Sequence, residues 1–316
     1  MESKNEKITP GRLLVVGSSN TDMVIKTGHL PLPGETVIGG TFFMNPGGKG
    51  ANQAVAASRL GTSVTFICKT GNDIFGHQSC QLLQEERIDT SYVFSDIRNP
   101  SGVALITVDA NAENCIAVAS GANANLLPAD LEKAEKAIDH CDIVLMQLEI
   151  PIETVEYVAY TAHKKAKKVI LNPAPAQSLS KELLSRLYLI TPNETEAETL
   201  SGIKITDVES AGRAAKEICR LGVENAVVTL GSKGAFIYGS ETVGKIDAFP
   251  VKAVDTTAAG DVFNGALCSA LLEGQTLPEA VGFACRAASI SVTRSGAWDS
   301  APYRNEIGLN SREQSQ

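Results

Sequence analysis

Residues 143–172 read IVLMQLEIPIETVEYVAYTAHKKAKKVILN and contain two short apolar runs on either side of a longer amphipathic segment. The runs 143–147 and 168–172 have the length and composition of buried β-strands, whereas residues 152–166 repeat apolar side chains at helical spacing. A strand, a helix and a second strand in this order favour a β-α-β unit, in which the two strands lie parallel.

The same alternation continues in both directions along the chain. Further strands are predicted at 12–17, 64–69 and 225–230, together with a short strand that ends at residue 191. Further helices are predicted at 51–60, 75–86, 128–139, 207–221, 260–273 and 277–292. This order predicts an α/β fold with a mostly parallel central sheet covered by helices on both faces, a three-layer core of the Rossmann-like kind.

Two stretches interrupt the alternation. Residues 23–27 and 35–44 are predicted to be strands joined by the turn LPLPG, and residues 103–109 and 114–119 to form a second hairpin. No helical pattern separates the members of either pair, so we expect a small separate antiparallel sheet, a lid inserted into the core at two points. The lid would comprise 20–45 and 101–120, the core 11–19, 46–100 and 121–316, and residues 1–10 a flexible N-terminus. ALITV and CIAVA are apolar on both faces, so the outer face of the lid needs a cover such as a second subunit.

Composition narrows the classes of partner. The 316 residues carry a net charge of −8, which argues against nucleic acid or an anionic membrane as the main partner. The seven cysteines are scattered and contain no CxxC pair, which is typical of reduced thiols in the cytoplasm. The charged start of the chain does not resemble a signal peptide, and no apolar run is long enough to span a membrane. A soluble cytoplasmic protein is expected.

The segment VDTTAAGDVFNG at 254–265 places small residues before a predicted helix. Unpaired backbone N–H groups at a helix start attract anions, so Ala258, Ala259 and Gly260 form a candidate cradle for phosphoryl oxygens. Asp261 stands at the mouth of this cradle and is a candidate general base for an attacking hydroxyl. The alternative interpretation is that Asp261 only caps the helix.

The segment NPGGKGANQ at 45–53 runs into another predicted helix. Its glycines allow a close approach of the backbone, and Lys49 and Asn52 offer donors; with Asn20 and Asp22 after the first strand they suit several sugar hydroxyls. The segment lacks the GxxxxGK[ST] pattern of a Walker A loop. An ordinary glycine-rich turn with an exposed lysine is the alternative.

Two more segments follow predicted strands. TPNETEAE at 191–198 offers Asn193 on the nucleotide side and Glu196 for a water or Mg²⁺ network, or merely an acidic first helical turn. VTLGSKG at 228–234 offers two glycines and a lysine near phosphate, or merely a hairpin turn. Glu149, near another strand end, faces the same pocket or is a solvated loop carboxylate.

Together these segments resemble the ribokinase-like family of sugar kinases, which includes fructokinases and adenosine kinases. The resemblance rests on GGKGANQAVAASRLG at 47–61, TPNETEAE at 191–198, TLGSKG at 229–234 and VDTTAAGDVFNGAL at 254–267, and it extends from about Arg12 to Arg304. It implies ATP-dependent phosphorylation of the 5-hydroxyl of D-ribose to give D-ribose 5-phosphate and ADP. It also implies a homodimer formed through the lid sheets.

The resemblance further implies a role for individual residues. Asp261 is the expected base, with the backbone of Ala258, Ala259, Gly260 and Asp261 as the anion hole. The expected sugar-binding residues are Asn20, Thr21, Asp22, Gly48, Lys49, Gly50, Ala51, Asn52, Glu149 and Asp261. The expected nucleotide-binding residues are Asn193, Thr229, Leu230, Gly231, Ser232, Lys233, Gly234, Gly260, Asp261 and Cys285. An activating K⁺ is expected at Asp255, Thr257, Ser291, Arg294, Gly296 and Ser300, mostly through main-chain oxygens, and Mg²⁺ is expected to arrive with ATP and involve Glu196.

Two departures from the family pattern concern the nucleotide side. Many relatives have glycine where this chain has Ala258, and a methyl group there is tolerated only if φ is negative. Cys285 occupies an adenine-side position where other residues are common.

The acceptor stays open at this stage between ribose and 2-deoxyribose, a ketose or adenosine. A nucleoside acceptor would require aromatic side chains near the sugar, and only Phe42 and Phe43 lie in the predicted lid. A catalytically silent regulator that binds sugar or nucleotide is an alternative of a different class.

Overall fold

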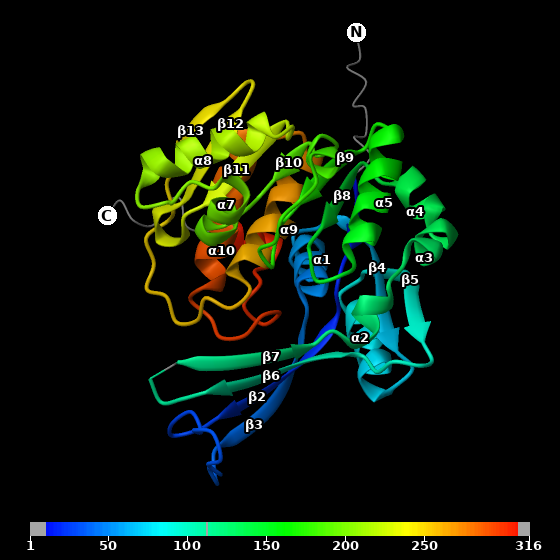
Figure 1. Cartoon of the computed structure of the whole chain (residues 1–316), viewed down its shortest axis with the longest axis vertical. Coiled ribbons are helices and arrows are strands. Elements are labelled where there is room, and N and C mark those ends of the chain that lie inside the picture. Colours follow the sequence, from blue (N-terminus) through cyan, green and yellow to red (C-terminus); the bar gives the residue numbers. More distant parts are fainter. Residues whose placement is uncertain (1–10, 112, 309–316) are drawn as a thin grey trace.

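A nine-stranded sheet forms the centre of the computed structural model, which describes residues 11–111 and 113–308; the predicted flexible segment 1–10 lies outside these residues. The strand order is β13-β12-β11-β10-β9-β8-β1-β4-β5 (Figure 1). The strands are β1 Arg12–Val16, β4 Ser63–Gly71, β5 Asp89–Asp96, β8 Ile143–Met146, β9 Lys168–Leu171, β10 Leu189–Ile190, β11 Asn225–Thr229, β12 Ala235–Gly239 and β13 Val243–Ile246. Pairing is parallel from β11 to β5, and β12 and β13 add an antiparallel edge.

Helices cover both faces of this sheet. They are α1 Lys49–Arg59, α2 Ile74–Glu85, α3 Pro128–Lys133, α4 Glu135–His140, α5 Ile152–Lys164, α6 Lys181–Leu184, α7 Glu194–Ser201, α8 Val208–Arg220, α9 Ala259–Leu272, α10 Leu277–Ser291 and α11 Arg304–Ile307, with 3₁₀ turns η1 Gly121–Asn125 and η2 Gly231–Lys233. Alternate residues of β1 enter different cores: Leu13 and Val15 pack with α1, α9 and α10, whereas Leu14 and Val16 pack with α5 and α8. Both faces are therefore buried, and the predicted three-layer α/β core is confirmed.

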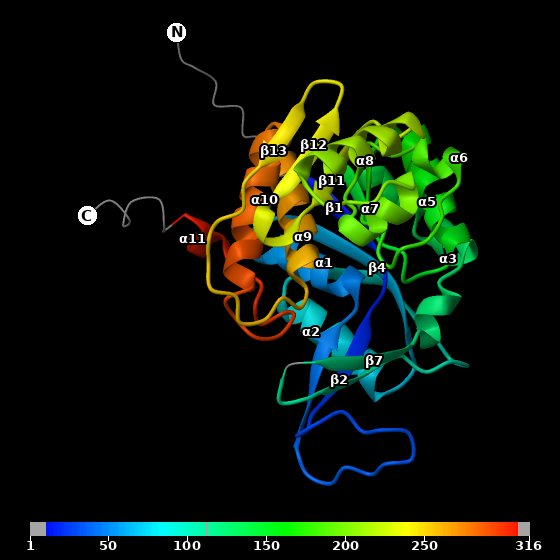
Figure 2. The same cartoon turned by 60° about the vertical axis from the view of Figure 1, so that its left-hand side comes forward.

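A second, four-stranded sheet lies below the core in Figures 1 and 2. It consists of β2 Asn20–Lys26, β3 Thr41–Gly47, β6 Gly102–Val108 and β7 Asn114–Ala119 in the order β3-β2-β6-β7. Its two hairpins are antiparallel, as predicted, and they join through the parallel pairing of β2 with β6. Because β2 follows β1 after only a short link, residues at the start of β2 lie at the carboxyl end of the central sheet.

Several boundaries differ from the sequence-based expectation. Residues 35–40 are not strand, because Gly39 and Gly40 adopt positive φ values of 106° and 107°, so β3 begins only at Thr41. The predicted helix 128–139 is interrupted at Ala134, where α3 ends and α4 begins. Strands β5, β12 and β13 were not predicted. The segment 228–234 contains a turn, since η2 joins β11 to the antiparallel strand β12.

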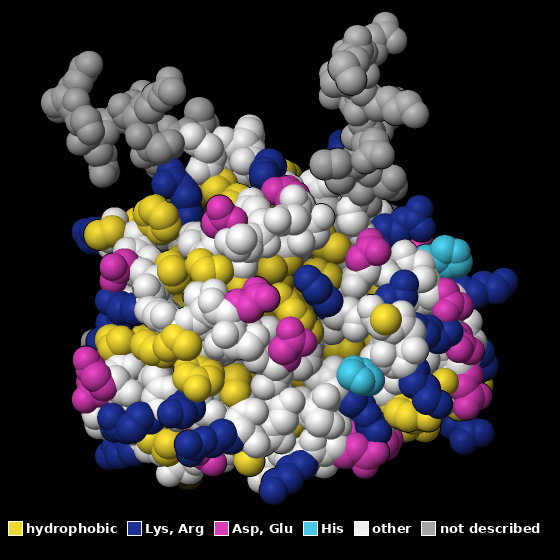
Figure 3. All heavy atoms as spheres, turned by 90° about the horizontal axis from the view of Figure 1, so that it is seen from above, with side chains coloured by type: hydrophobic (Ala, Val, Ile, Leu, Met, Phe, Trp, Pro, Cys, Tyr) yellow, Lys and Arg dark blue, Asp and Glu magenta, His cyan; other side chains and the backbone are white. Residues whose placement is uncertain are grey.

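The surface opposite the small sheet mixes charges of both signs. In Figure 3 basic and acidic side chains are interspersed with apolar ones over this face. Within residues 11–111 and 113–308, no helix combines the length and apolar character needed to cross a membrane.

Candidate active site

The carboxylate of Asp261 is the centre of a polar cluster between two helices. It stands in the first turn of α9 and is 7% exposed. From α1, Asn52 Nδ2 donates to Asp261 Oδ2 and Gln53 Nε2 donates to Oδ1, both at 2.9 Å. The residue at the N-cap of α9 is Ala258, and no side-chain hydrogen bond caps this helix. The alternative that Asp261 only caps its helix is therefore wrong.

The protonation behaviour of Asp261 reflects these surroundings. Burial raises the pKa of its carboxyl above the usual range, while the Lys49 ammonium and the two amide donors oppose this shift. A carboxylate that is held by donors, yet has an increased affinity for a proton, is suited to act as a general base.

The backbone before Asp261 is the predicted anion hole, and only part of it is free to donate. Ala258 adopts the left-handed conformation with φ 57°, so the negative φ that the sequence analysis required for its methyl group is absent. The N–H of Ala259 donates to Thr256 O at 3.2 Å. The hydrogen bonds among the described residues include none from the N–H groups of Gly260 and Asp261, so both donors are free at the positive end of α9.

Two cavities meet at this backbone. A polar one of 210 Å³ contains Asp261 and is lined by Lys49, Asn172, Ala174, Thr191, Asn193, Glu196, Thr229, Thr256, Ala258, Ala259, Gly260, Asp261 and Asn264. A larger, mainly apolar one of 520 Å³ extends from β11 to α10. Thr229, Thr256, Ala259 and Gly260 line both, so the backbone predicted to be the anion hole lies in the wall between them.

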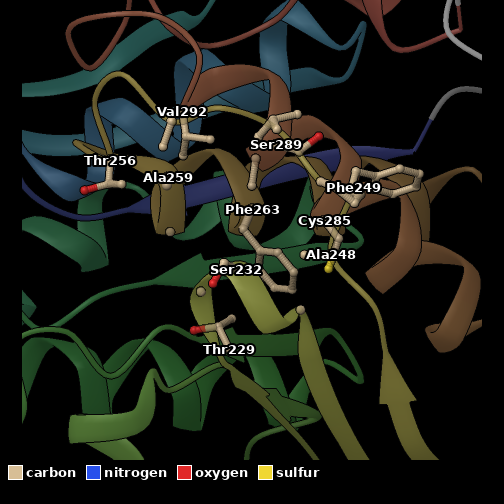
Figure 4. A pocket seen from close by; sticks show the side chains of 17 residues that line it. Thr229, Ser232, Ala248, Phe249, Thr256, Ala259, Phe263, Cys285, Ser289 and Val292 are labelled. Carbon is tan, nitrogen blue, oxygen red and sulfur yellow. The ribbon is translucent and has the colours of Figure 1, made fainter.

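The apolar cavity has the size and chemistry of a nucleoside pocket. Phe263 and Cys285 line it from α9 and α10, with Thr229 and Ser232 on one side and Ser289 and Val292 on the other (Figure 4). Burial raises the pKa of the Cys285 thiol to about 11, so the thiol stays neutral. A largely apolar slot beside free N–H donors fits a nucleotide whose base enters the slot and whose phosphates reach the polar cavity.

Most residues predicted for the nucleotide line one of these cavities, and two do not. Gly231, Gly234 and Cys285 line the apolar cavity, together with Thr229 and Ser232. Leu230 instead packs in the core beneath β11, and Lys233 is exposed at the surface of η2. The side chains of these two residues lie outside both cavities, and their part in binding the nucleotide stays a prediction.

The residues predicted for the sugar surround Lys49, the first residue of α1. Its N–H donates to Glu149 Oε2 at 3.0 Å, and Ser18 Oγ donates to the same oxygen at 2.5 Å. Burial alone would lower the pKa of the Lys49 ammonium, but Asp261, Glu149, Glu196 and Asp22 together raise it. Lys49 therefore remains a cation among four carboxylates, which places donors and acceptors together in the part of the site predicted for the sugar.

The neighbouring backbone is tightly fitted. Gly48 has φ 89°, and a Cβ there would lie 2.8 Å from Asn20 N. Asn20 is itself buried and accepts a hydrogen bond from Asn123 Nδ2 at 2.8 Å, while Thr21 is half-buried. The side chain of Ala51 is fully buried in the core, so only its backbone is left for the predicted contact with the sugar. Its position follows from helical geometry, which turns Ala51 away from the face of Asn52.

Asp22 is held in an unfavourable position that predicts a measurable effect on stability. Burial, with help from Glu149 and Asp261, raises the pKa of its carboxyl from 3.8 to about 6. The folded protein therefore binds this proton more tightly than the unfolded chain, and stability is lost as pH rises from about 3.8 to about 6. We expect Asp22→Asn to raise the melting temperature at pH 7.5 by a few degrees, on the order of 1 kcal/mol, and to raise it less at pH 4.5.

Thermal unfolding at the two pH values tests this prediction. Asp73 is a matched control: burial would raise the pKa of its carboxyl, but the backbone N–H groups of Ser101 and Gly76 hold it below the usual range. Asp73→Asn should therefore destabilise the protein at pH 7.5. An Asp22→Asn protein that melts below the unsubstituted one at pH 7.5 would contradict the assignment.

The predicted metal residues fall in two places. Glu196 forms a capping box with Asn193 at the start of α7 and lines the polar cavity. Asp255 Oδ2 accepts from Gly296 N at 2.9 Å and Oδ1 accepts from Thr257 N at 2.9 Å, which joins two of the segments predicted for K⁺. Among residues 11–111 and 113–308, no group of three or more His, Cys, Asp or Glu side chains is arranged to hold a metal ion.

Comparison with known proteins agrees with this geometry. Residues 11–304 match the pfkB family of carbohydrate kinases. The chain belongs to this family. The ribokinase of Haemophilus influenzae is 46% identical over 294 residues, covering 93% of this chain and 96% of that protein. The structure of Arabidopsis thaliana ribokinase complexed with ribose and ATP has a TM-score of 0.89 at 32% identity, covering 95% of this chain and 98% of that one. The deoxyribokinase of Salmonella typhimurium is 36% identical over 291 residues, covering 92% of this chain and 95% of that protein.

This pfkB family carbohydrate kinase also has site residues that the sequence analysis missed. Gln53 donates to Asn172 Oδ1 at 3.0 Å as well as to Asp261, and Gln147 Nε2 donates to Gln53 Oε1 at 2.6 Å. Gln147 and Asn172 directly follow β8 and β9, and only the structure shows that they bear on Asp261 through Gln53. Trp298, whose indole contacts Asn52, gave no signal beyond being the only tryptophan.

Proposed function

We propose that this pfkB family carbohydrate kinase transfers the γ-phosphoryl group of ATP to the 5-hydroxyl of D-ribose. The main support is the position of Asp261, which lines the polar cavity directly beside the wall shared with the nucleoside-sized cavity. An acceptor hydroxyl in the polar cavity would lie between this carboxylate and the phosphate end of a nucleotide. The named activities of the most similar relatives support ribose as the acceptor.

The reaction requires one proton transfer and one bond exchange. Asp261 accepts the proton of the 5-hydroxyl as the new O–P bond forms and the bond to the β-phosphate oxygen breaks, releasing ADP. The N–H groups of Gly260 and Asp261 stabilise the charge on the transferred group, and the Lys49 ammonium adds a positive charge on the acceptor side. Asn20, Asp22 and Glu149 are assigned to the remaining sugar hydroxyls.

Two metal ions belong to the proposal. Mg²⁺ would be carried by the ATP phosphates, with Glu196 and Asn193 nearby in the polar cavity, consistent with a cation that needs few protein ligands. K⁺ would neutralise charge near the anion hole, held by main-chain oxygens around Asp255 and Gly296. The guanidinium of Arg294 is a cation without an acceptor atom and pairs with Glu306, so only the main-chain oxygen of this residue could serve as a ligand.

The small sheet is proposed to act as a lid and as a dimer surface. Register places Met23, Ile25, Phe42, Met44 and Leu105 on one face of it, opposite the face that carries Asp22. Phe42, Met44 and Leu105 are 58%, 48% and 55% exposed. A contiguous apolar face of this kind is typical of a protein interface.

Disruption of this face should separate the subunits. Leu105→Asp places a charge in the middle of the outer face, and we expect a dimer to become a monomer in sedimentation velocity. Ile97→Asp is the matched control, because Ile97 is 84% exposed but lies outside the small sheet. A Leu105→Asp protein that still sediments as a dimer would place the interface elsewhere.

The function is tested by ADP release from Mg·ATP with a panel of sugars, first in potassium and then in sodium buffer. Release that depends on ribose and is faster in potassium would support both the acceptor and the monovalent cation. A preference for 2-deoxyribose would retain the mechanism and change the substrate, in the direction suggested by the relative from Salmonella typhimurium that is named deoxyribokinase. Absence of ADP release with every sugar would favour the alternative of a catalytically silent regulator.

All seven cysteines are free, which is consistent with a cytoplasmic location.

A further inference from the structure

The only tryptophan of the chain contacts the active-site helix α1. Trp298 is 6% exposed, and its indole Nε1 donates to Asn52 Oδ1 at 3.0 Å. The other end of the same amide, Asn52 Nδ2, donates to Asp261 Oδ2 at 2.9 Å. Trp298, Asn52 and Asp261 thus form a continuous chain of two hydrogen bonds that ends on the proposed base.

The chemistry of the two outer groups fixes the orientation of the group between them. An indole N–H can act only as a hydrogen-bond donor, and an ionised carboxylate can act only as an acceptor. An asparagine amide can satisfy both partners in one orientation alone, with its oxygen toward the indole and its nitrogen toward the carboxylate. The amide is therefore held from both ends, and rotation by 180° would break both hydrogen bonds.

The backbone of Trp298 is itself anchored to the same helix. Arg59, at the last turn of α1, donates through Nη1 to Trp298 O and to Ala301 O, and it pairs with Glu86. Its guanidinium also lies over the ring of Tyr303, 4.8 Å from the centroid. Asn52 and Arg59 are seven residues apart, so they lie on one face of α1, two turns from each other.

We propose that Trp298 is a positioning residue for phosphoryl transfer, whose indole N–H orients the Asn52 amide so that it holds Asp261 in place. This inference rests on the proposed function, because it assigns Asp261 the role of base. Asn52 is also assigned to the sugar, so an amide with a fixed orientation would keep the Asp261 carboxylate and the acceptor hydroxyl in a constant relative position.

The fact that Trp298 is the only tryptophan allows a substitution at the level of one atom. Growth of a tryptophan auxotroph on β-(3-benzothienyl)alanine replaces the N–H of this single indole by sulfur and keeps the ring shape. Growth on 7-azatryptophan is the matched control, since this analogue retains the N–H donor. We expect the benzothienyl protein to have a kcat about 5- to 20-fold lower than the unsubstituted protein. This decrease corresponds to the loss of one ordinary hydrogen bond and of the fixed orientation that it gives to the Asn52 amide. The 7-aza protein should stay within about twofold of the unsubstituted protein.

A second measurement separates positioning from general structural support. In an Asn52→Ala background the amide is absent, so the change from N–H to sulfur should have no further effect on kcat. The indole N–H gives one cross-peak in a ¹H–¹⁵N spectrum, and its hydrogen exchange should accelerate in Asn52→Ala. This readout needs neither activity nor substitution at position 298.

The outcomes distinguish the two proposals. Absence of transfer to any sugar by the unsubstituted protein would contradict the proposed function. Ribose-dependent transfer with equal kcat for the two analogues, or an equal loss with and without Asn52, would overturn only the role of Trp298. Indole exchange that is already fast in the unsubstituted protein would also overturn it, since the hydrogen bond would then not persist in solution.

Discussion

Asp261→Asn is expected to lower the turnover number by about 10³-fold, because the substitution removes the group that accepts the hydroxyl proton. The side chain keeps its shape, so the sugar pocket should persist. Its new NH₂ group must face one of the two donors, Asn52 Nδ2 or Gln53 Nε2, and one hydrogen bond of the cluster is lost. Initial rates at saturating ATP and ribose measure turnover, and calorimetric titration measures ribose binding, which we expect to change by less than about fivefold.

A suitable control is another aspartate at a helix start. Asp207 caps α8 by accepting from Ser210 N at 2.7 Å, and asparagine is an equally good cap, so Asp207→Asn should leave turnover unchanged. Near-normal turnover in Asp261→Asn would contradict the assignment of Asp261 as the general base. A loss of ribose binding as large as the loss of turnover would indicate that Asp261 mainly holds the sugar.

Gly265→Ala is expected to damage both stability and turnover. Gly265 lies where α9 crosses α1, and a Cβ would come within 2.7 Å of Gln53 O and 2.9 Å of Ala57 N. These are backbone atoms and cannot rotate away, so the helices must separate. Overpacking of this kind costs about 1–3 kcal/mol, which for a chain of this length lowers the melting temperature by roughly 2–5 °C. Since Asp261 is on one helix and its two donors are on the other, we also expect turnover to fall by about 10²-fold.

Gly282→Ala provides the matched helical control. Gly282 lies in α10, and a Cβ there would meet nothing within 4 Å. Alanine is the better helix former, so this protein should melt at the same temperature as the unsubstituted one or slightly above it. Thermal unfolding and initial rates compare the two variants. Equal behaviour of the two would show that α1 and α9 are not in tight contact in solution.

Local sequence patterns were sufficient to predict the part of the fold in which strands and helices alternate. The alternation of strands and helices predicted the central sheet, and the apolar sequence of β1 and β8 reflects burial on both faces. Strand β5, with sequence DTSYVFSD, was missed because a half-exposed edge strand lacks the continuous apolar run of a buried one. The early start predicted for β3 failed for a conformational reason, the positive φ of two glycines.

The candidate site was predicted unevenly for a similar reason. Asp261, Lys49 and Asn52 lie in motifs at helix starts, where the local sequence pattern itself contains the side chains that line the site. Gln53 and Trp298 act through contacts between segments more than 200 residues apart in sequence, and a pattern in one segment contains no information on the other. The left-handed conformation of Ala258 was likewise unforeseen, because a residue with a Cβ rarely adopts it.

The shared wall between the two cavities has an evolutionary consequence. Apart from the Thr229 and Thr256 side chains, the parts common to both cavities are backbone and small residues of the anion hole. Under the proposed assignment of Asn20 and Asp22 to the sugar, substitutions in β2, which carries both residues, can therefore alter the acceptor without disturbing the nucleotide, and substitutions around Cys285 can do the reverse. A gene duplicate of such an enzyme can diverge toward a new sugar in small steps while it retains its phosphoryl donor.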